Sequence, residues 1–154
     1  MLFRSLFVSG LIRAGNDPHR IVVSDKRPER ATEIAERYGV RALEPKDAVR
    51  DAATILIVVK PQDMAALLDD IGAVTPAEAL IISLAAGWRT ERIEAAFRPG
   101  TACLRAMPNT PAVVDLGMTV VSAGTTCTPR QVECATSLLS AVGPVATVTE
   151  DQIG

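Results

Sequence analysis

Four short stretches combine polar side chains or glycine with an abrupt end to a run of apolar residues. They are Ser24-Asp25-Lys26-Arg27, Val59-Lys60-Pro61, Ala85-Ala86-Gly87 and Met107-Pro108-Asn109-Thr110-Pro111. Together they offer hydroxyl groups, cations, an amide and an approachable backbone, which suit the binding of a polar or anionic small molecule. Ligands of an open α/β sheet bind outside the carboxyl ends of its strands, so the four stretches predict one shared crevice.

The first stretch has the residue types that bind the ribose of a nucleotide cofactor. Asp25 can accept a hydrogen bond from a ribose 2′-hydroxyl, whereas Ser24, Lys26 and Arg27 can bind a 2′-phosphate. These preferences oppose each other, so NADP and NAD both stay open as the cofactor. The structural alternative is a solvated turn in which the carboxylate caps the following helix.

The other three stretches suit the rest of such a cofactor, and each has a plainer alternative. Lys60 brings a cation and Pro61 a rigid turn to a strand end, although surface lysines are common there. Ala85-Ala86-Gly87 lets a ligand approach the backbone, or simply allows tight packing. In the fourth stretch, two prolines stiffen a loop whose Asn109 amide and Thr110 hydroxyl can hold a nicotinamide carboxamide or a small substrate, with a structural turn as the alternative.

The composition argues against several other kinds of site. His19 is the only histidine, and Cys103, Cys127 and Cys134 lack C-x-x-C spacing, so we predict no metal site and no nucleophile paired with histidine. Three cysteines fit thiols in a reducing cytosol. A net charge of −2 with both signs scattered indicates neither a nucleic-acid partner nor a membrane surface. No apolar segment has the length that a bilayer span needs.

The elements that position the four stretches alternate along the chain. We predict helices at 2–13, 29–38, 46–50, 61–71, 91–97 (capped by Thr90) and 128–142, and strands at 21–24, 40–43, 55–59, 79–84, 102–105, 118–122 and 145–148. The strand at 55–59 is a continuous aliphatic run, typical of a parallel strand buried on both faces. The alternation predicts one α/β domain over residues 1–154, with a mostly parallel sheet flanked by helices.

The four stretches, in this order and approximate spacing, resemble those of pyrroline-5-carboxylate reductases. The likeness covers nearly the whole chain and includes Val22-Val23-Ser24-Asp25, Val59-Lys60-Pro61-Gln62, Ser83-Leu84-Ala85-Ala86-Gly87 and Arg105-Ala106-Met107-Pro108-Asn109-Thr110-Pro111. That family reduces the C=N bond of 1-pyrroline-5-carboxylate to L-proline with NADPH or NADH. The resemblance therefore implies a cytoplasmic oxidoreductase of proline biosynthesis that has a Rossmann-like fold and a small-molecule substrate.

The same resemblance assigns residues to parts of the cofactor. It puts Ser24, Lys26 and Arg27 at the NADP ribose phosphate. It puts along the cofactor Val59, Lys60, Pro61, Ala85, Ala86 and Gly87, and near the nicotinamide Met107, Pro108, Asn109 and Thr110. No residue is an obvious general acid, so we name no catalytic residue and expect the chemistry to be mostly positioning.

Three departures from the family pattern change the expectation. The family opens with a strand and a glycine-rich turn that binds the pyrophosphate, but Met1 begins where the following helix is already under way. Pro45 stands in place of an asparagine that helps to hold the cofactor. The chain also stops at Gly154, before the family's helical carboxyl-terminal domain, which makes the dimer and supplies part of the substrate site. We therefore expect a Rossmann-like domain that is incomplete at both ends.

The absent strand is the central one of such a sheet, so a gap should separate the strand at 21–24 from that at 55–59. Unpaired strand edges invite pairing with another chain. We therefore expect a truncated or mis-started gene product, or a fragment, that has little or no activity alone and self-associates as a homo-oligomer or folds poorly. Two other interpretations stay open: another Rossmann dehydrogenase, of the 2-dehydropantoate or β-hydroxyacid type, and a non-catalytic nucleotide-binding or interaction module.

Overall fold

The computed structural model describes residues 2–109, 118–125, 127–140 and 145–148. Its helices are α1 (Leu2–Arg13), α2 (Pro28–Tyr38), α3 (Pro45–Arg50), α4 (Met64–Ile71), α5 (Thr90–Glu94) and α6 (Pro129–Leu139), with 3₁₀ turns η1 (Pro18–Arg20) and η2 (Pro61–Asp63). Its strands are β1 (Val22–Val23), β2 (Arg41–Ala42), β3 (Thr54–Ile57), β4 (Leu80–Ser83), β5 (Ala102–Asn109), β6 (Met118–Ala123) and β7 (Val145–Thr147). Each expected helix and strand is found, and the differences lie at their ends.

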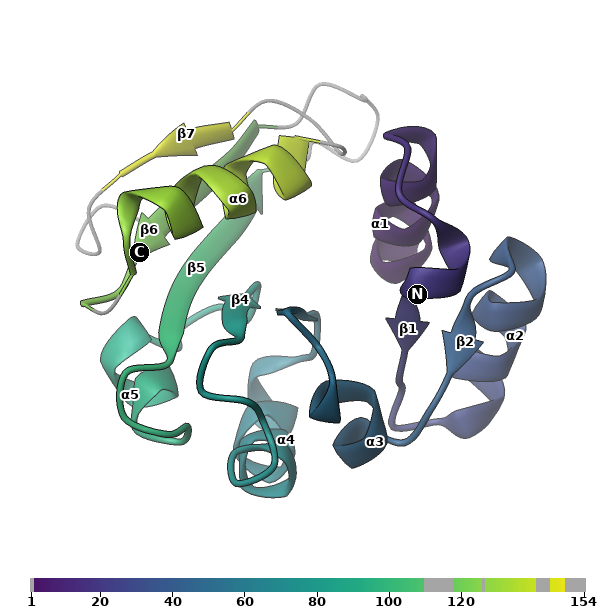
Figure 1. Cartoon of the computed structure of the whole chain (residues 1–154), viewed down its shortest axis with the longest axis horizontal. Coiled ribbons are helices and arrows are strands. Elements are labelled where there is room, and N and C mark those ends of the chain that lie inside the picture. The colour runs from purple at the N-terminus through teal and green to yellow at the C-terminus, as the bar shows by residue number, and fades with distance from the viewer. Residues whose placement is uncertain (1, 110–117, 126, 141–144, 149–154) are drawn as a thin grey trace.

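Five strands form one sheet in the order β3-β4-β5-β6-β7. The first three strands are parallel, β6 runs antiparallel to β5, and β7 is parallel to β6. The sheet is therefore mostly parallel, as predicted. Figure 1 shows α6 above β4 and shows α3 and α4 below it. This is the α/β layering that the alternation of elements indicates.

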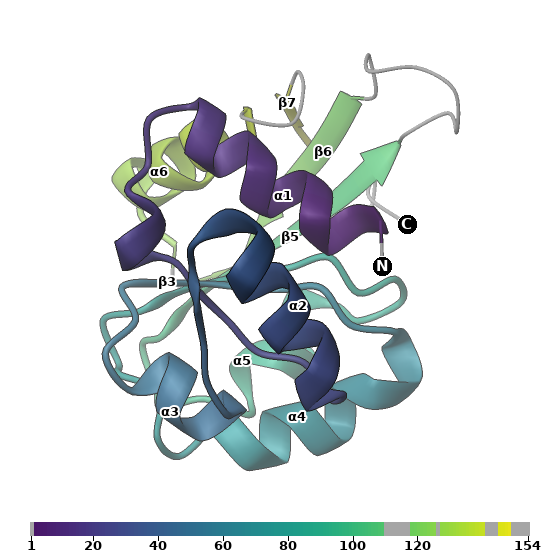
Figure 2. The same cartoon turned by 90° about the vertical axis from the view of Figure 1, so that its right-hand side faces the viewer.

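The strands β1 and β2 form a separate, two-stranded parallel sheet. Among the described strands, none pairs with the other edge of β1 or with the edge of β3 that faces away from β4. The predicted gap between these two strands is therefore confirmed. Figure 2 shows α1 and α2 side by side on this part of the molecule, where they contact each other.

The five-stranded sheet separates two apolar clusters. On the side of α3, α4 and α5, the buried side chains include Val49, Ile55, Ile57, Met64, Leu68, Ile71, Ile81 and Ile93. On the side of α6, they include Leu80, Ile82, Leu104, Ala106, Val121, Ala135 and Leu139. The strand β4 lies between both clusters and is buried along its whole length. It therefore gives the turn that follows it a rigid base.

The strand β3 is less buried than its sequence indicates. Ile55 and Ile57 are buried against α4, whereas Leu56, Val58 and Val59 are half-buried. The prediction of a strand buried on both faces is therefore wrong here. The physical reason is that β3 is the edge strand of its sheet. The side chains of a neighbouring strand therefore shield it along one edge only.

The helix ends follow local sequence signals in most places. Pro28 opens α2, and Gly39 ends it in the left-handed conformation with φ 73°. Thr128 caps α6 in a capping box with Gln131. Thr90, however, is the first residue of α5, and the preceding arginine takes the N-cap position without a side-chain hydrogen bond. The predicted cap at Thr90 is therefore wrong, because the helix starts one residue earlier.

The strand β5 continues to Asn109 and so includes residues that we predicted as a loop. Met107 pairs with Val120, and Pro108 and Asn109 continue the antiparallel pairing with β6. The prediction of a loop at these three positions is wrong, because a distant strand supplies their partners. Thr110 and Pro111 lie outside the described residues.

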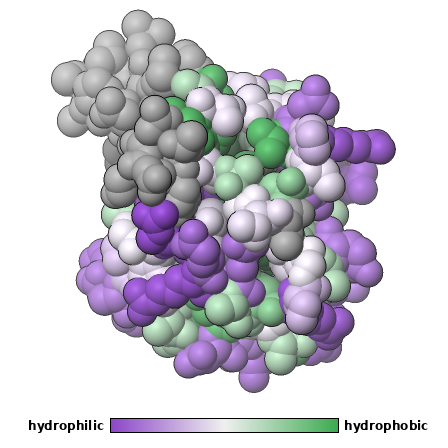
Figure 3. Space-filling model, turned by 90° about the vertical axis from the view of Figure 1, so that its left-hand side faces the viewer, coloured by the Kyte–Doolittle hydropathy of each residue, from purple (hydrophilic) through white to green (hydrophobic). Residues whose placement is uncertain are grey.

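The surface is mixed in character. Figure 3 shows one side of the molecule, on which the green areas are small and interrupted by purple and white ones. Leu43, which follows β2, exposes 39% of its surface. No helix within the described ranges is long and apolar enough to cross a membrane.

Candidate functional site

Register brings the carboxyl ends of three strands to the same edge of the sheet. Ile57 at the end of β3 lies opposite Ser83 at the end of β4, and Ser83 lies opposite Arg105 of β5. Met107 is therefore two residues further along β5 in the same direction. The turns that contain Lys60 and Gly87 leave the sheet from this common edge.

Two side-chain contacts link the turns at this edge. The Trp88 indole Nε1, after β4, donates a hydrogen bond of 3.2 Å to the Pro61 carbonyl, after β3. The Lys26 ammonium, after β1, lies 3.3 Å from the Asp63 carboxylate, after β3. The turns that follow β1, β3 and β4, which hold three of the four predicted stretches, thus lie together.

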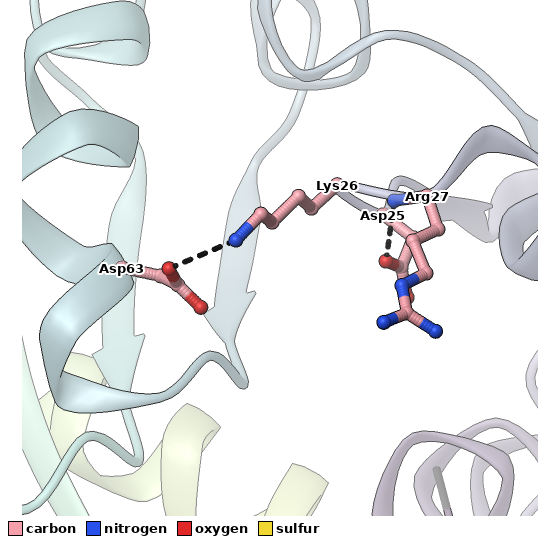
Figure 4. Close-up of polar contacts among 4 residues, drawn as sticks. All are labelled: Asp25, Lys26, Arg27 and Asp63. Carbon is pink, nitrogen blue, oxygen red and sulfur yellow. Dashed lines mark hydrogen bonds and ion pairs between the residues drawn. The ribbon is translucent and has the colours of Figure 1, made fainter.

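The turn after β1 is shaped by its own carboxylate. The Asp25 Oδ1 atom accepts a hydrogen bond of 2.8 Å from the Arg27 backbone N–H. Arg27 then serves as the N-cap of α2. Lys26 and Arg27 are exposed, and Figure 4 shows the Lys26 side chain reaching towards Asp63 while the Arg27 side chain takes a different direction. Two cations are therefore presented to solvent in different directions from one short turn.

Ser24 carries an unused polar atom in this turn. Its Oγ atom is buried and makes no hydrogen bond within the described structure. Buried hydroxyl groups nearly always have a partner, so such an atom needs an explanation. A bound phosphate or ribose oxygen would provide one.

The turn after β3 is held in place by its neighbour. Val59 is half-buried, and Lys60 and Pro61 are exposed. Lys60 takes the N-cap position of η2, where Pro61 is the first residue. The bond from Trp88 to the Pro61 carbonyl fixes this turn to the turn after β4.

The turn after β4 leaves open space in front of its backbone. Ala85 is buried, and its N–H donates to the Ser83 hydroxyl at 3.2 Å. Ala86 and Gly87 are exposed. Gly87 has φ 78°, a conformation that favours glycine, and a Cβ atom there would meet no other atom within 4 Å. A ligand can therefore approach the Gly87 backbone closely.

Residues 5–87, more than half of the chain, match the family described as NADP oxidoreductase, coenzyme F420-dependent. The chain belongs to this family. The matched range contains the turns after β1, β3 and β4, and the segment Met107–Asn109 lies beyond it. The predicted Rossmann-like α/β class and oxidoreductase family are therefore confirmed.

Curated relatives of this NADP oxidoreductase domain are pyrroline-5-carboxylate reductases. The enzyme of Mycobacterium tuberculosis (strain ATCC 25618 / H37Rv) is 36% identical over 152 residues, which cover 95% of this chain and 52% of the relative. The enzyme of Escherichia coli (strain K12) is 30% identical over 148 residues, which cover 95% of this chain and 55% of the relative. The chain thus spans about half the length of the curated relatives it matches, and the predicted resemblance is confirmed.

Solved structures agree with this relationship. A pyrroline-5-carboxylate reductase from Coxiella burnetii aligns with a TM-score of 0.86 at 35% identity, over 97% of this chain and 57% of that one. The Plasmodium falciparum pyrroline carboxylate reductase with NADP bound aligns with a TM-score of 0.80 at 17% identity, over 96% of this chain and 54% of that one. At that identity, the second structure supports the fold alone.

The turn after β1 fits the adenosine end of the cofactor that the family name specifies. NADP differs from NAD by a 2′-phosphate, which needs hydrogen-bond donors and cations. The unbonded Ser24 hydroxyl and the exposed Lys26 and Arg27 side chains supply both. Among the described residues, no glycine-rich turn precedes β1 to receive the pyrophosphate.

Three residues at this edge of the sheet were not predicted from the sequence. Asp63 and Trp88 act through contacts with residues far away in the sequence, which no local pattern reveals. Trp88 is nevertheless the only tryptophan, it is 8% exposed, and the Arg92 guanidinium lies 3.7 Å from its ring centre. Arg105 is only 2% exposed and lies in register between Ser83 and Ser122.

Two of the three cysteines, Cys103 and Cys127, are not activated. Burial, with a smaller contribution from Glu94, raises the pKa of Cys103 to about 12. Burial also raises the pKa of Cys127, whose Sγ atom donates to the Cys103 carbonyl at 3.1 Å. Both thiols are therefore protonated and poorly nucleophilic at neutral pH. The described part of the chain contains no group of three or more His, Cys, Asp or Glu side chains that could hold a metal ion.

Proposed function

We propose that this chain is the NAD(P)-binding, Rossmann-like domain of a pyrroline-5-carboxylate reductase, spanning residues 1–154. The whole enzyme transfers a hydride from NADPH or NADH to the C=N bond of 1-pyrroline-5-carboxylate and forms L-proline. The observation that supports this most is 36% identity to the Mycobacterium tuberculosis enzyme over 95% of the chain. The meeting of the strand-end turns at one edge of the sheet agrees with it.

In this proposal, the residues of the chain bind and orient the cofactor, which carries the reactive hydride. Ser24, Lys26 and Arg27 bind the ribose end through the hydroxyl and the two cations. Val59, Lys60 and Pro61 and the turn Ala85-Ala86-Gly87 lie along the cofactor, where the tie from Trp88 keeps the two turns together.

The far end of the proposed cofactor site is formed by β5. Met107, Pro108 and Asn109 extend from the buried part of this strand towards the proposed position of the nicotinamide. The resemblance assigns Thr110, which lies outside the described residues, to the same end of the cofactor. Antiparallel strand pairing with β6 holds Met107 to Asn109 in place. None of these residues is assigned a proton-transfer step.

We infer that the isolated chain has little or no reductase activity and self-associates. Among the described elements, β1 and β3 each have one edge that pairs with no other strand. Such edges pair readily with another chain. The proposed substrate is a small molecule. No nucleic-acid or membrane partner is proposed, and three cysteines without a disulfide among them support a cytoplasmic location.

Equilibrium dialysis with NADPH and with NADH tests the proposed function. No pyrophosphate-binding turn lies among the described residues, so we expect weak binding. The dissociation constants should lie in the millimolar range, which corresponds to a binding free energy of about −4 kcal/mol. Absence of binding for both nucleotides at saturating concentrations would contradict the proposal. Proline formation by the isolated chain would show that its own residues suffice for catalysis, against our inference.

A further inference from the structure

An ion pair joins the two sides of the gap between β1 and β3. The Lys26 ammonium and the Asp63 carboxylate are 3.3 Å apart, and their side chains are 78% and 34% exposed. Lys26 belongs to the turn after β1, and Asp63 belongs to η2, after β3 (Figure 4). The contact therefore connects the small sheet with the five-stranded sheet at the edge where the turns meet.

This pair occupies a cation that the 2′-phosphate of NADP would use. A carboxylate and a phosphate compete for the same ammonium group, and a carboxylate left nearby repels the phosphate. Arg27 does not take part in the pair, since its side chain points elsewhere. The Ser24 Oγ atom makes no hydrogen bond, so its bonding capacity is available to either cofactor.

We propose that Asp63 determines cofactor preference by holding Lys26 away from a 2′-phosphate. This inference rests on the proposed function, because it requires a nucleotide at the turn after β1. NADH, which has a 2′-hydroxyl, loses nothing from the Lys26–Asp63 pair. NADPH has to break the pair to reach Lys26 and then lies close to the Asp63 carboxylate.

The substitution Asp63→Asn tests the proposal, because it removes the charge and keeps the shape of the side chain. The probes are adenosine 2′,5′-bisphosphate and adenosine 5′-monophosphate, which differ in the 2′-phosphate and need no pyrophosphate site. From the strength of exposed ion pairs, we expect D63N to tighten the bisphosphate dissociation constant about two- to fivefold and to change that of the monophosphate much less. The difference should shrink in about 1 M salt, where exposed charges are screened.

A matched control lies in α4, the helix that follows η2. Asp70 of α4 pairs with Lys46 at 3.5 Å, and the two side chains are 42% and 57% exposed. Asp70→Asn therefore makes the same change of charge in a similar ion pair away from the turn after β1. We expect D70N to leave the ratio of the two dissociation constants at its parent value. Circular dichroism spectra equal to that of the parent chain would show that both variants fold.

The double variant D63N in the K26Q background distinguishes the loss of the Lys26–Asp63 pair from a general effect of removing a negative charge. In the K26Q background, D63N should give a clearly smaller change in the ratio, because no ammonium is left to release. An unchanged ratio in D63N, or an equal change in D70N, would overturn the inference while leaving the cofactor site intact. Failure of every variant and of the parent to bind either probe would overturn both the inference and the proposed function.

Discussion

At the scale of single residues, the site depends on contacts between turns. Trp88 is the clearest example, since one indole N–H fixes the backbone of Pro61 across the edge of the sheet. The ring itself is buried and lies against the Arg92 guanidinium. Such a residue acts on the site through position, because it holds the two turns that the proposed cofactor needs.

The substitution Trp88→Phe removes the indole N–H and keeps most of the buried aromatic surface. We expect a loss of about 1–2 kcal/mol in the free energy of unfolding, from the lost hydrogen bond and the smaller ring. Urea unfolding followed by circular dichroism measures this loss. A variant as stable as the parent would show that the tie between the turns contributes nothing.

The thiols make a second prediction at this scale. Burial raises the pKa of Cys103 from about 9 to about 12, so its thiolate is absent at moderate pH. An aromatic disulfide reagent at about pH 8 should therefore label exposed Cys134 quickly and Cys103 only after unfolding. Rapid labelling of Cys103 in the folded chain would contradict its burial.

The shifted pKa also has a consequence for stability. Folding favours the protonated thiol of Cys103, so this contribution is complete below its ordinary pKa of about 9. It is lost as the pH rises from there through about 12. The same urea experiments at increasing alkaline pH should show a falling free energy of unfolding.

At the scale of elements, local sequence signals predicted most of the fold. Pro28 and Gly39 mark the ends of α2 because proline and glycine restrict or release the backbone by themselves. Thr90 shows the limit of such signals: threonine is a favoured N-cap residue, but here Arg89 takes the cap position and Thr90 is the first residue of α5. Met107 to Asn109 were missed as a strand because their partners, residues 118–120, come later in the chain.

The capping box of α6 gives a prediction at this scale. Thr128 accepts a hydrogen bond from the Gln131 N–H at 3.2 Å, and the Gln131 side chain accepts one from the Thr128 N–H at 2.8 Å. Thr128→Ala should lower the free energy of unfolding by about 1 kcal/mol in urea titrations. The control Thr136→Ala, within α6, removes a methyl group and a hydroxyl that bonds the Val132 carbonyl, but no cap, and should have a smaller effect. Equal losses in the two variants would argue against the cap.

At the scale of the whole molecule, the gap between β1 and β3 is the feature that matters most. It was predictable, because the order of the motifs placed these two strands on either side of a position that none of the described strands fills. The Lys26–Asp63 and Trp88–Pro61 contacts were not, because they join residues 37 and 27 positions apart. Sequence reasoning thus found the turns but not the bonds that hold them together.

The open edges predict how the chain behaves in solution. We expect concentration-dependent self-association of the isolated chain, because β1 and β3 each have an edge that no described strand pairs with. Sedimentation velocity over a range of concentrations measures this. A compact monomer at all concentrations, with one cooperative melting transition, would contradict the expectation.

The central claim is that the turns after β1, β3 and β4 form one nucleotide site. Two-dimensional amide NMR of the isotope-labelled chain, titrated with NADPH, tests it most directly. We expect concentration-dependent shifts that cluster at Ser24 to Arg27, at Lys60 and Asp63, and at Ala85 to Trp88. Shifts that cluster elsewhere on the molecule, or no shifts at saturating NADPH, would contradict the account.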